Sequence, residues 1–202
     1  MDSIYVSVPK VYTMKFCSAC AAPVALRIPA DDTRERFVCT ECGTIHYQNP
    51  NMVVGTLPIW DIQGEVKVLL CKRAIEPRYG FWTLPAGFME NQETCRQAAQ
   101  RETIEEAGAN IELHELFSVL SVSHVDQVHL FYRATLIDTN YLAGTESLEV
   151  ALFAEHEIPW AEIAFPTVSQ TLKFFFEDLK KVRTGGQFSL HEHDFYKSHL
   201  PE

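Results

Sequence analysis

Residues 87–109 constrain the fold and the chemistry of this chain more than any other stretch, because helix-forming composition coincides there with several glutamates. No glycine or proline interrupts residues 93–107, and Gly108 is a natural helix terminator. Asn91 precedes this run and can cap its first turn. We therefore expect a helix over residues 93–107.

Three carboxylates lie near the end of this predicted helix. Glu102, Glu105 and Glu106 fall on neighbouring sides of its last turns, so their carboxylates can converge at one point. Clustered carboxylates repel one another unless a cation lies among them, and oxygen-only donors select Mg²⁺ or Mn²⁺. These ions also favour phosphate oxygens as ligands, so the sequence predicts a divalent-metal site for a phosphate-bearing substrate.

Two further features of the helix are structural. Arg101 lies about two turns after Glu93, so an ion pair between them could hold the preceding loop against the helix, which would make both residues structural. The face opposite the glutamates carries small side chains that allow close packing on a sheet: Cys95, Ala98, Ala99, Thr103 and Ala107.

The order of these residues resembles the signature of the Nudix hydrolases. Gly87 is followed after five residues by Glu93, and after seven more by the run RETIEEAGA, which starts at Arg101. The chain departs from the signature at Thr103 and Ala109, where a bulkier aliphatic residue is usual; these departures concern packing more than chemistry. An acidic surface helix without a ligand is the alternative.

The resemblance implies an α/β fold, namely a Nudix α/β/α sandwich with a mixed sheet. It implies that Glu102, Glu105 and Glu106, with the carbonyl of Gly87, hold Mg²⁺ or Mn²⁺, and that Glu105 and Glu106 are catalytic. Nudix pyrophosphatases often supply one further glutamate from beyond this signature, and Glu149 is the candidate here, as metal ligand or base. The implied reaction is hydrolysis of the pyrophosphate bond of a nucleoside diphosphate linked to another moiety.

Four cysteines define a second candidate metal site. Cys17 and Cys20 are separated by eighteen residues from Cys39 and Cys42, which is the two-knuckle spacing of a structural zinc site. A pair of disulfides is the alternative, although a chain without a secretion signal suggests a reducing compartment. Because some thirty residues cannot build a core of their own, Zn²⁺ binding and folding of this lobe should be one event.

We expect four segments: a leader at 1–13, a zinc ribbon at 14–50, a Nudix hydrolase domain at 51–184, as the resemblance implies, and a C-terminal tail at 185–202. The tail is polar and contains several histidines, so we expect it to be ordered only in part. The other elements expected in the main domain are strands at 52–60, 66–73, 110–122, 127–137 and 146–153 and a final helix at 168–182.

Further motifs resemble the FAD and ADP-ribose pyrophosphatase branch of the family: HYQNP at 46–50, LLCKR at 69–73, WTLPAGFME at 82–90 and ESLE at 146–149. FAD, cleaved to FMN and AMP, and ADP-ribose are therefore the expected substrates. The element SQPWPFPxS, typical of ribbon-bearing NADH pyrophosphatases, is not found. The alternatives are an NADH or capped-RNA pyrophosphatase, and a non-catalytic Nudix protein that senses nucleotides or binds RNA.

Three residues are candidates for substrate contacts. Tyr47 precedes the first main strand and could line a cleft, Arg73 ends the second strand and could meet a phosphate, and Trp82 could stack on a base. The alternatives are ordinary packing for the two aromatic residues and a solvated surface charge for Arg73.

The charge balance bears on the partners. Seventeen basic residues against twenty-seven acidic residues give a net charge of −10, so we expect no general attraction to nucleic acid or anionic lipid. No apolar run is long enough to span a membrane. We expect a small dinucleotide-type substrate, a homodimer, and an intracellular, soluble protein, in the cytoplasm or in an organelle if a longer precursor exists.

Overall fold

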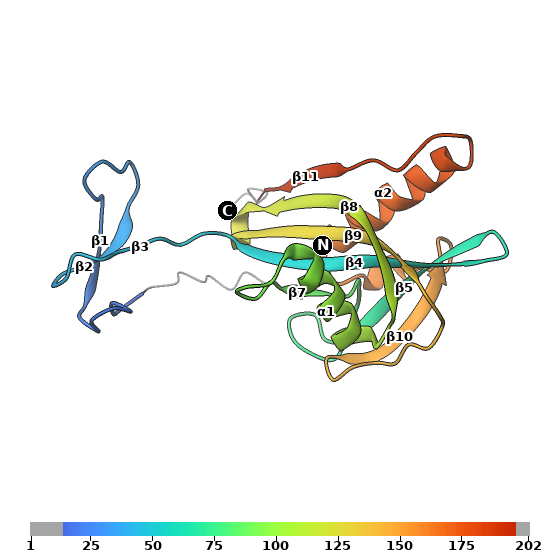
Figure 1. The fold of residues 1–202 in the computed structure, drawn as a ribbon, viewed down its shortest axis with the longest axis horizontal. Coiled ribbons are helices and arrows are strands. Elements are labelled where there is room, and N and C mark those ends of the chain that lie inside the picture. Colours follow the sequence, from blue (N-terminus) through green and yellow to red (C-terminus); the bar gives the residue numbers. More distant parts are fainter. Residues whose placement is uncertain (1–13, 197–202) are drawn as a thin grey trace. The chain divides into compact units, whose positions relative to one another are not determined.

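The computed structural model describes residues 14–196, which divide into two compact units at residue 50 (Figure 1). The predicted leader at residues 1–13 lies outside the described residues, as do residues 197–202.

The N-terminal unit is a small antiparallel sheet of β1 (Val24–Arg27), β2 (Arg36–Cys39) and β3 (Ile45–His46). Among residues 14–50, only the side chains of Cys17 and Cys39 are buried. This unit therefore has no hydrophobic core of ordinary size, and the cysteines occupy the place of one.

The second unit is built on a mixed, eight-stranded sheet. Six strands follow the order β10-β5-β4-β9-β8-β11, while β6 pairs with β5 and β7 pairs with β4. The pairings β4 with β9 and β8 with β11 are parallel, and the others are antiparallel. The bounds are β4 Asn51–Ile62, β5 Glu65–Arg73, β6 Trp82–Thr83, β7 Ala86–Phe88, β8 Ile111–Val122, β9 Gln127–Leu136, β10 Ser147–Ala154 and β11 His191–Phe195.

The central strands are covered by helices on both faces, because successive side chains of a strand point to opposite sides. Val54 of β4 and Leu130 of β9 pack with the small residues of α1 (Cys95–Ala107). Leu57 and Phe131, from the same two strands, pack instead with α2 (Pro166–Val182). The expected helix–sheet–helix sandwich is confirmed (Figure 1).

The helix α1 begins later than expected and has a different N-cap. Thr94, rather than Asn91, caps it: the Thr94 side chain accepts a hydrogen bond from Gln97 N, and the Gln97 side chain accepts one from Thr94 N. This reciprocal capping box satisfies two backbone donors at once. Gly108 ends the helix at a φ of 56°, as expected from the sequence.

Two 3₁₀ turns, η1 (Ser123–Val125) and η2 (Trp160–Glu162), complete the described elements. Among residues 14–196, neither α-helix has the length and apolarity needed to cross a membrane.

Within the segment expected to be a partly ordered tail, residues 191–195 form the edge strand β11. Although β11 is polar, as the sequence HEHDF indicates, it pairs in parallel register with β8. Phe188 and Phe195, on either side of its polar residues, pack against the core on the α2 face. Contacts distant in sequence therefore order a segment whose composition is that of a tail.

Asp178 of α2 anchors the chain that leads into β11. Its side chain is fully buried; Oδ2 accepts from Ser189 N at 3.0 Å and lies 2.8 Å from His191 Nε2, and Oδ1 accepts from Lys181 Nζ at 2.7 Å. Burial by itself raises the pKa of Asp178, but these hydrogen bonds and positive neighbours lower it to about 2. The carboxylate thus favours the folded state when it is ionised.

We predict that Asp178→Asn lowers the free energy of unfolding at pH 7 by about 1–3 kcal/mol, because it removes the charge and leaves buried donors poorly paired. The control Glu177→Gln, exposed on the same helix, should stay within about 0.5 kcal/mol of the wild type. Urea unfolding measures both.

The pH dependence of this effect follows from a folded pKa of about 2, below the unfolded value of about 3.9. The stabilisation by Asp178 is complete above the unfolded pKa and is lost as the pH falls through the folded one. The difference between wild type and Asp178→Asn should therefore shrink between about pH 4 and pH 2. A difference that stays constant over this range would contradict the assignment.

Candidate functional site

Arg101 ties the loop before α1 to the helix. Its Nε donates to Glu93 Oε1 at 2.6 Å and its Nη2 donates to Glu93 Oε2 at 3.0 Å, while Nη2 also donates to Phe88 O at 3.2 Å. The ion pair predicted between Arg101 and Glu93 is therefore present and bidentate. It also lowers the pKa of Glu93.

The remaining amino group of Arg101 orients two of the three candidate metal ligands. Its Nη1 donates to Glu102 Oε1 at 2.7 Å and to Glu105 Oε2 at 3.0 Å. Glu106 Oε2 instead accepts from the backbone N of Ala86 at 3.1 Å. The expectation that all three carboxylates converge at one point is thus met only in part, because the guanidinium holds two of them and β7 holds the third.

The three glutamates differ in burial. Glu102 and Glu106 are only 8% and 6% exposed, whereas the side chain of Glu105 is 58% exposed. Burial raises the pKa of Glu102 and raises that of Glu106 to about 8. Two buried carboxylates next to a third create a demand for positive charge, which is the condition for binding a divalent cation.

Gly87 is required for the close approach of β7 to α1. A Cβ atom at this position would collide with the carboxylate of Glu102. Any larger residue would displace that carboxylate from its place beside the backbone of the loop. The glycine of the signature is therefore explained by packing against a candidate ligand.

The two departures from the signature are accommodated in the core. Thr103 is fully buried; its hydroxyl donates to Ala99 O at 2.8 Å and lies 2.6 Å from Thr56 Oγ1. Ala109 is 1% exposed and packs with Leu69 and Leu136. A hydrogen-bonded threonine and a close-packed alanine thus replace the usual bulkier side chains.

The structure does not bring Glu149 to this cluster. Glu149 is exposed on β10, opposite Lys72 of β5, and its Oε2 lies 3.9 Å from Lys72 Nζ. Glu146 precedes β10 and interacts electrostatically with the cluster. Burial is the main cause that raises the pKa of Glu102 and Glu106, and the negative charge of Glu146 adds to it. The motif ESLE at 146–149 contains both glutamates. The sequence favoured Glu149 as the additional carboxylate, but the motif does not give the strand register that decides which side each residue faces.

The four cysteines converge in the N-terminal unit. Their ligand atoms all lie within 4.8 Å of one another, and among the described residues they are the one group of three or more histidines, cysteines or carboxylates that does so. Cys20 Sγ lies 3.4 Å from both Cys39 Sγ and Cys42 Sγ, too far for a disulfide. The hydroxyl of Thr44, 3.1 Å from Cys42 Sγ, lowers the pKa of Cys42 to about 6. Four sulfurs in this arrangement fit tetrahedral Zn²⁺.

Two family models match this chain. The model of the Nudix domain matches residues 50–177, and the model described as Nudix N-terminal, a zinc ribbon, matches residues 15–48. This chain belongs to the Nudix hydrolase family. Its carboxylate-bearing helix is accordingly the Nudix helix, and its four-cysteine unit is the ribbon that precedes the domain in this branch.

Among solved structures, a Nudix hydrolase from Nitrosomonas europaea is 52% identical, with a TM-score of 0.84 and coverage of 91% of this chain and 100% of that chain. The Nudix domain of NrtR from Shewanella oneidensis, solved with ADP ribose, is 20% identical with a TM-score of 0.56, over 66% of this chain and 90% of that chain. The second likeness concerns the fold alone.

Curated relatives cover less of the molecule. The NAD-capped RNA hydrolase NudC of Haemophilus influenzae is 30% identical over 69% of this chain and 47% of its own length. A putative 8-oxo-dGTP diphosphatase of Mycobacterium tuberculosis is 36% identical over 47% of this chain and 48% of its own length. The chain thus spans about half the length of the curated relatives it matches.

The predicted substrate contacts of this Nudix protein have different surroundings. Tyr47 is exposed in the ribbon unit, with the guanidinium of Arg36 5.2 Å from its ring centroid. Trp82 is only 5% exposed and packs edge-on against Phe153, so its ring belongs to the core rather than to an open stacking surface. Arg73 is partly buried, and burial lowers its pKa. The negative charges of Glu106 and Glu146 act in the opposite direction.

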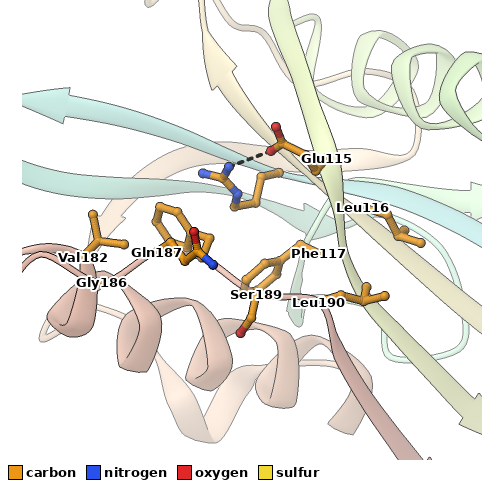
Figure 2. Close-up of a pocket in the computed structure, with 10 residues that line it drawn as sticks. Glu115, Leu116, Phe117, Val182, Gly186, Gln187, Ser189 and Leu190 are labelled. Atoms are coloured by element: carbon orange, nitrogen blue, oxygen red, sulfur yellow. Dashed lines mark hydrogen bonds and ion pairs between the residues drawn. The ribbon is translucent and has the colours of Figure 1, made fainter.

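Two cavities on the α2 side of the Nudix domain are separate from the glutamates. The first, of about 560 Å³, lies between the end of α2 and strands β8 and β9 (Figure 2). Its one cation, Arg133, is already paired with Glu115 at 2.8 Å and covers the ring of Phe188 at 4.0 Å. The second, of about 430 Å³, lies beside the first turns of α2. No glutamate of α1 lines either cavity.

We predict that protein prepared without chelator contains roughly one Zn²⁺ per chain, and that Cys39→Ser loses most of it. The ribbon unit should then unfold, because the metal takes the place of a core. Metal analysis by mass spectrometry and limited proteolysis near residue 39 measure the two effects. Cys95→Ser, on α1, is the matched control and should retain the metal; a zinc-free wild type would refute the assignment.

Proposed function

We propose that this Nudix protein hydrolyses the pyrophosphate bond of a nucleoside diphosphate linked to another moiety. The observation that supports this most is the glutamate cluster on α1, where Glu102 lies against the backbone of Gly87 and Glu106 against Ala86. The carboxylates of this cluster are hard oxygen donors that share one guanidinium with Glu93 or are held by a backbone N–H, and such donors fit Mg²⁺ or Mn²⁺.

In this proposal, Glu102, Glu105 and Glu106, with the carbonyl of Gly87, hold the divalent cation. Bound there, the ion would offset the negative charge of the pyrophosphate and make its phosphorus easier to attack. Glu105 is the most exposed of the three, so it can reach a water molecule on the open side of the cluster. It takes a proton as that water attacks one phosphorus, and the bond from this phosphorus to the bridging oxygen breaks to give two monophosphates.

Arg101 and Glu93 act as positioning residues. Arg101 uses two nitrogens on Glu93 and a third on Glu102 and Glu105, so both carboxylates are oriented before substrate binds. Such preorganisation lowers the entropic cost of assembling the site.

The substrates to test first are FAD, which would give FMN and AMP, and ADP-ribose, which would give AMP and ribose 5-phosphate. NADH and NAD-capped RNA are the second candidates, because several relatives bear the name NAD-capped RNA hydrolase. All four contain an AMP moiety joined through a pyrophosphate. The homodimer stays a prediction.

We predict that Glu105→Gln and Glu106→Gln each reduce turnover by roughly a hundredfold or more, given typical contributions of proton transfer and metal binding. A product assay with Mg²⁺ or Mn²⁺ over the four substrates measures this, and Glu112→Gln, exposed on β8, is the control. Full activity in both variants would exclude this role for the cluster.

We further propose that the additional carboxylate from beyond the signature is Glu146 rather than Glu149. Glu146→Gln should then lower turnover by about tenfold or more, while Glu149→Gln, which loses only an exposed ion pair, should stay within about twofold. The opposite result in the same assay would restore Glu149 to the role first expected from the sequence.

A further inference from the structure

The cavity beside the first turns of α2 is lined by aromatic and cationic side chains. We name it the aromatic groove; it lies between α2, η2 and the loop at 78–81 and includes Phe81, Trp160, Phe195, Arg78 and Lys173. Its volume is about 430 Å³, which is within the range of pockets for small ligands.

The charge of the aromatic groove is opposite to that of the whole chain. Two of its lining residues are cationic and none is acidic, although the chain carries a net charge of −10. Lys173 is exposed, and no described carboxylate forms an ion pair with it. In the other cavity, by contrast, Glu115 neutralises Arg133. The groove is therefore suited to an anion.

The aromatic side chains of the groove come from separate parts of the chain. Trp160 of η2 is 39% exposed, Phe81 precedes β6, and Phe195 belongs to β11. Arg78 lies over the ring of Phe81 at 5.3 Å from its centroid. Flat aromatic and cationic surfaces bind nucleobases by stacking, which contributes about 1–3 kcal/mol per base.

Arg73 contacts residues in and next to the groove and also interacts electrostatically with Glu106. Arg73 N donates to Phe81 O at 2.8 Å, and the Arg73 guanidinium lies over the ring of Phe165, next to Pro166 of the groove, at 5.1 Å. Ala86, whose N–H donates to Glu106 Oε2, is five positions after Phe81. The Cα atoms of Phe81 and Ala86 are therefore at most roughly 17 Å apart.

We infer that the aromatic groove binds the AMP moiety of the diphosphate substrate, with the base against Trp160 and Phe81 and the 5′-phosphate toward Lys173. This inference rests on the proposed function, since it assigns one half of the substrate to a place. The scissile pyrophosphate then extends past Arg73 toward the glutamates of α1.

The first experiment titrates AMP into the full chain and follows tryptophan fluorescence and calorimetry in parallel. Trp82 is buried and Trp60 packs on the α1 side, so Trp160 should report binding. Trp160→Phe keeps an aromatic ring and should bind AMP within about threefold of the wild-type affinity by calorimetry, but without the fluorescence change. A fluorescence change that survives in Trp160→Phe, or no AMP binding by the wild type at millimolar concentration, would overturn the assignment.

The second experiment removes the free cation of the groove. Lys173→Gln should weaken AMP binding by about three- to tenfold and raise the KM for FAD or ADP-ribose by a similar factor, with kcat within about twofold. Lys180→Gln, which removes the same charge from the same helix outside the groove, is the control. Circular dichroism verifies that both variants are folded.

The outcomes separate the two proposals. AMP binding that depends on Lys173 in a protein that hydrolyses none of the four diphosphates would support the groove as an AMP site and reject the proposed function. Hydrolysis with an unchanged KM in Lys173→Gln would leave the function standing and reject the groove as the substrate's AMP site. Equal AMP affinity in Lys173→Gln and Lys180→Gln would also reject it.

Discussion

The ion pairs of Arg101 are the interaction on which the candidate active site depends. One guanidinium bonds to Glu93 in the loop, to the carbonyl of Phe88, and to Glu102 and Glu105 on the helix. The loop and the helix therefore cannot move apart without breaking charge-assisted hydrogen bonds. The small side chains of α1 allow the helix to lie close to the sheet, and the absence of a side chain at Gly87 allows a carboxylate to lie against the loop.

The two units of the chain place metal ligands in physically different settings. In the ribbon, buried cysteine sulfurs stand where a hydrophobic core would be, so a soft ligand set fits a structural zinc ion. In the Nudix domain the hydrophobic core exists without metal, and the hard oxygen donors lie at its edge. One guanidinium there serves three carboxylates, and Glu106 is held by a backbone N–H, so the cluster has room for a further cation that binds phosphate.

The C-terminal strand β11 contributes both to the stability of the Nudix domain and to the wall of the aromatic groove. Asp178 fixes the turn before β11, and β11 then brings Phe195 to the wall of the aromatic groove. The groove also takes residues from the loop at 78–81 and from η2, and a hydrogen bond from Ala164 N to Trp82 O joins the residues that follow these two segments. A nucleotide site built in this way draws on four separate parts of the chain, which explains why no single motif indicates it.

The sequence by itself determined what depends on local patterns: the Nudix helix and its end at Gly108, its glutamates and Arg101, the spacing of the cysteines, the β4–β5 hairpin and the amphipathic final helix. Tertiary structure decided what depends on contacts distant in sequence. Strand register placed Glu149 opposite Lys72, and packing against Phe153 enclosed Trp82 in the core. Pairing with β8 ordered residues 191–195, a polar segment that we expected to belong to a tail. Local propensity is set within a few residues, whereas these outcomes are fixed by packing between segments far apart along the chain.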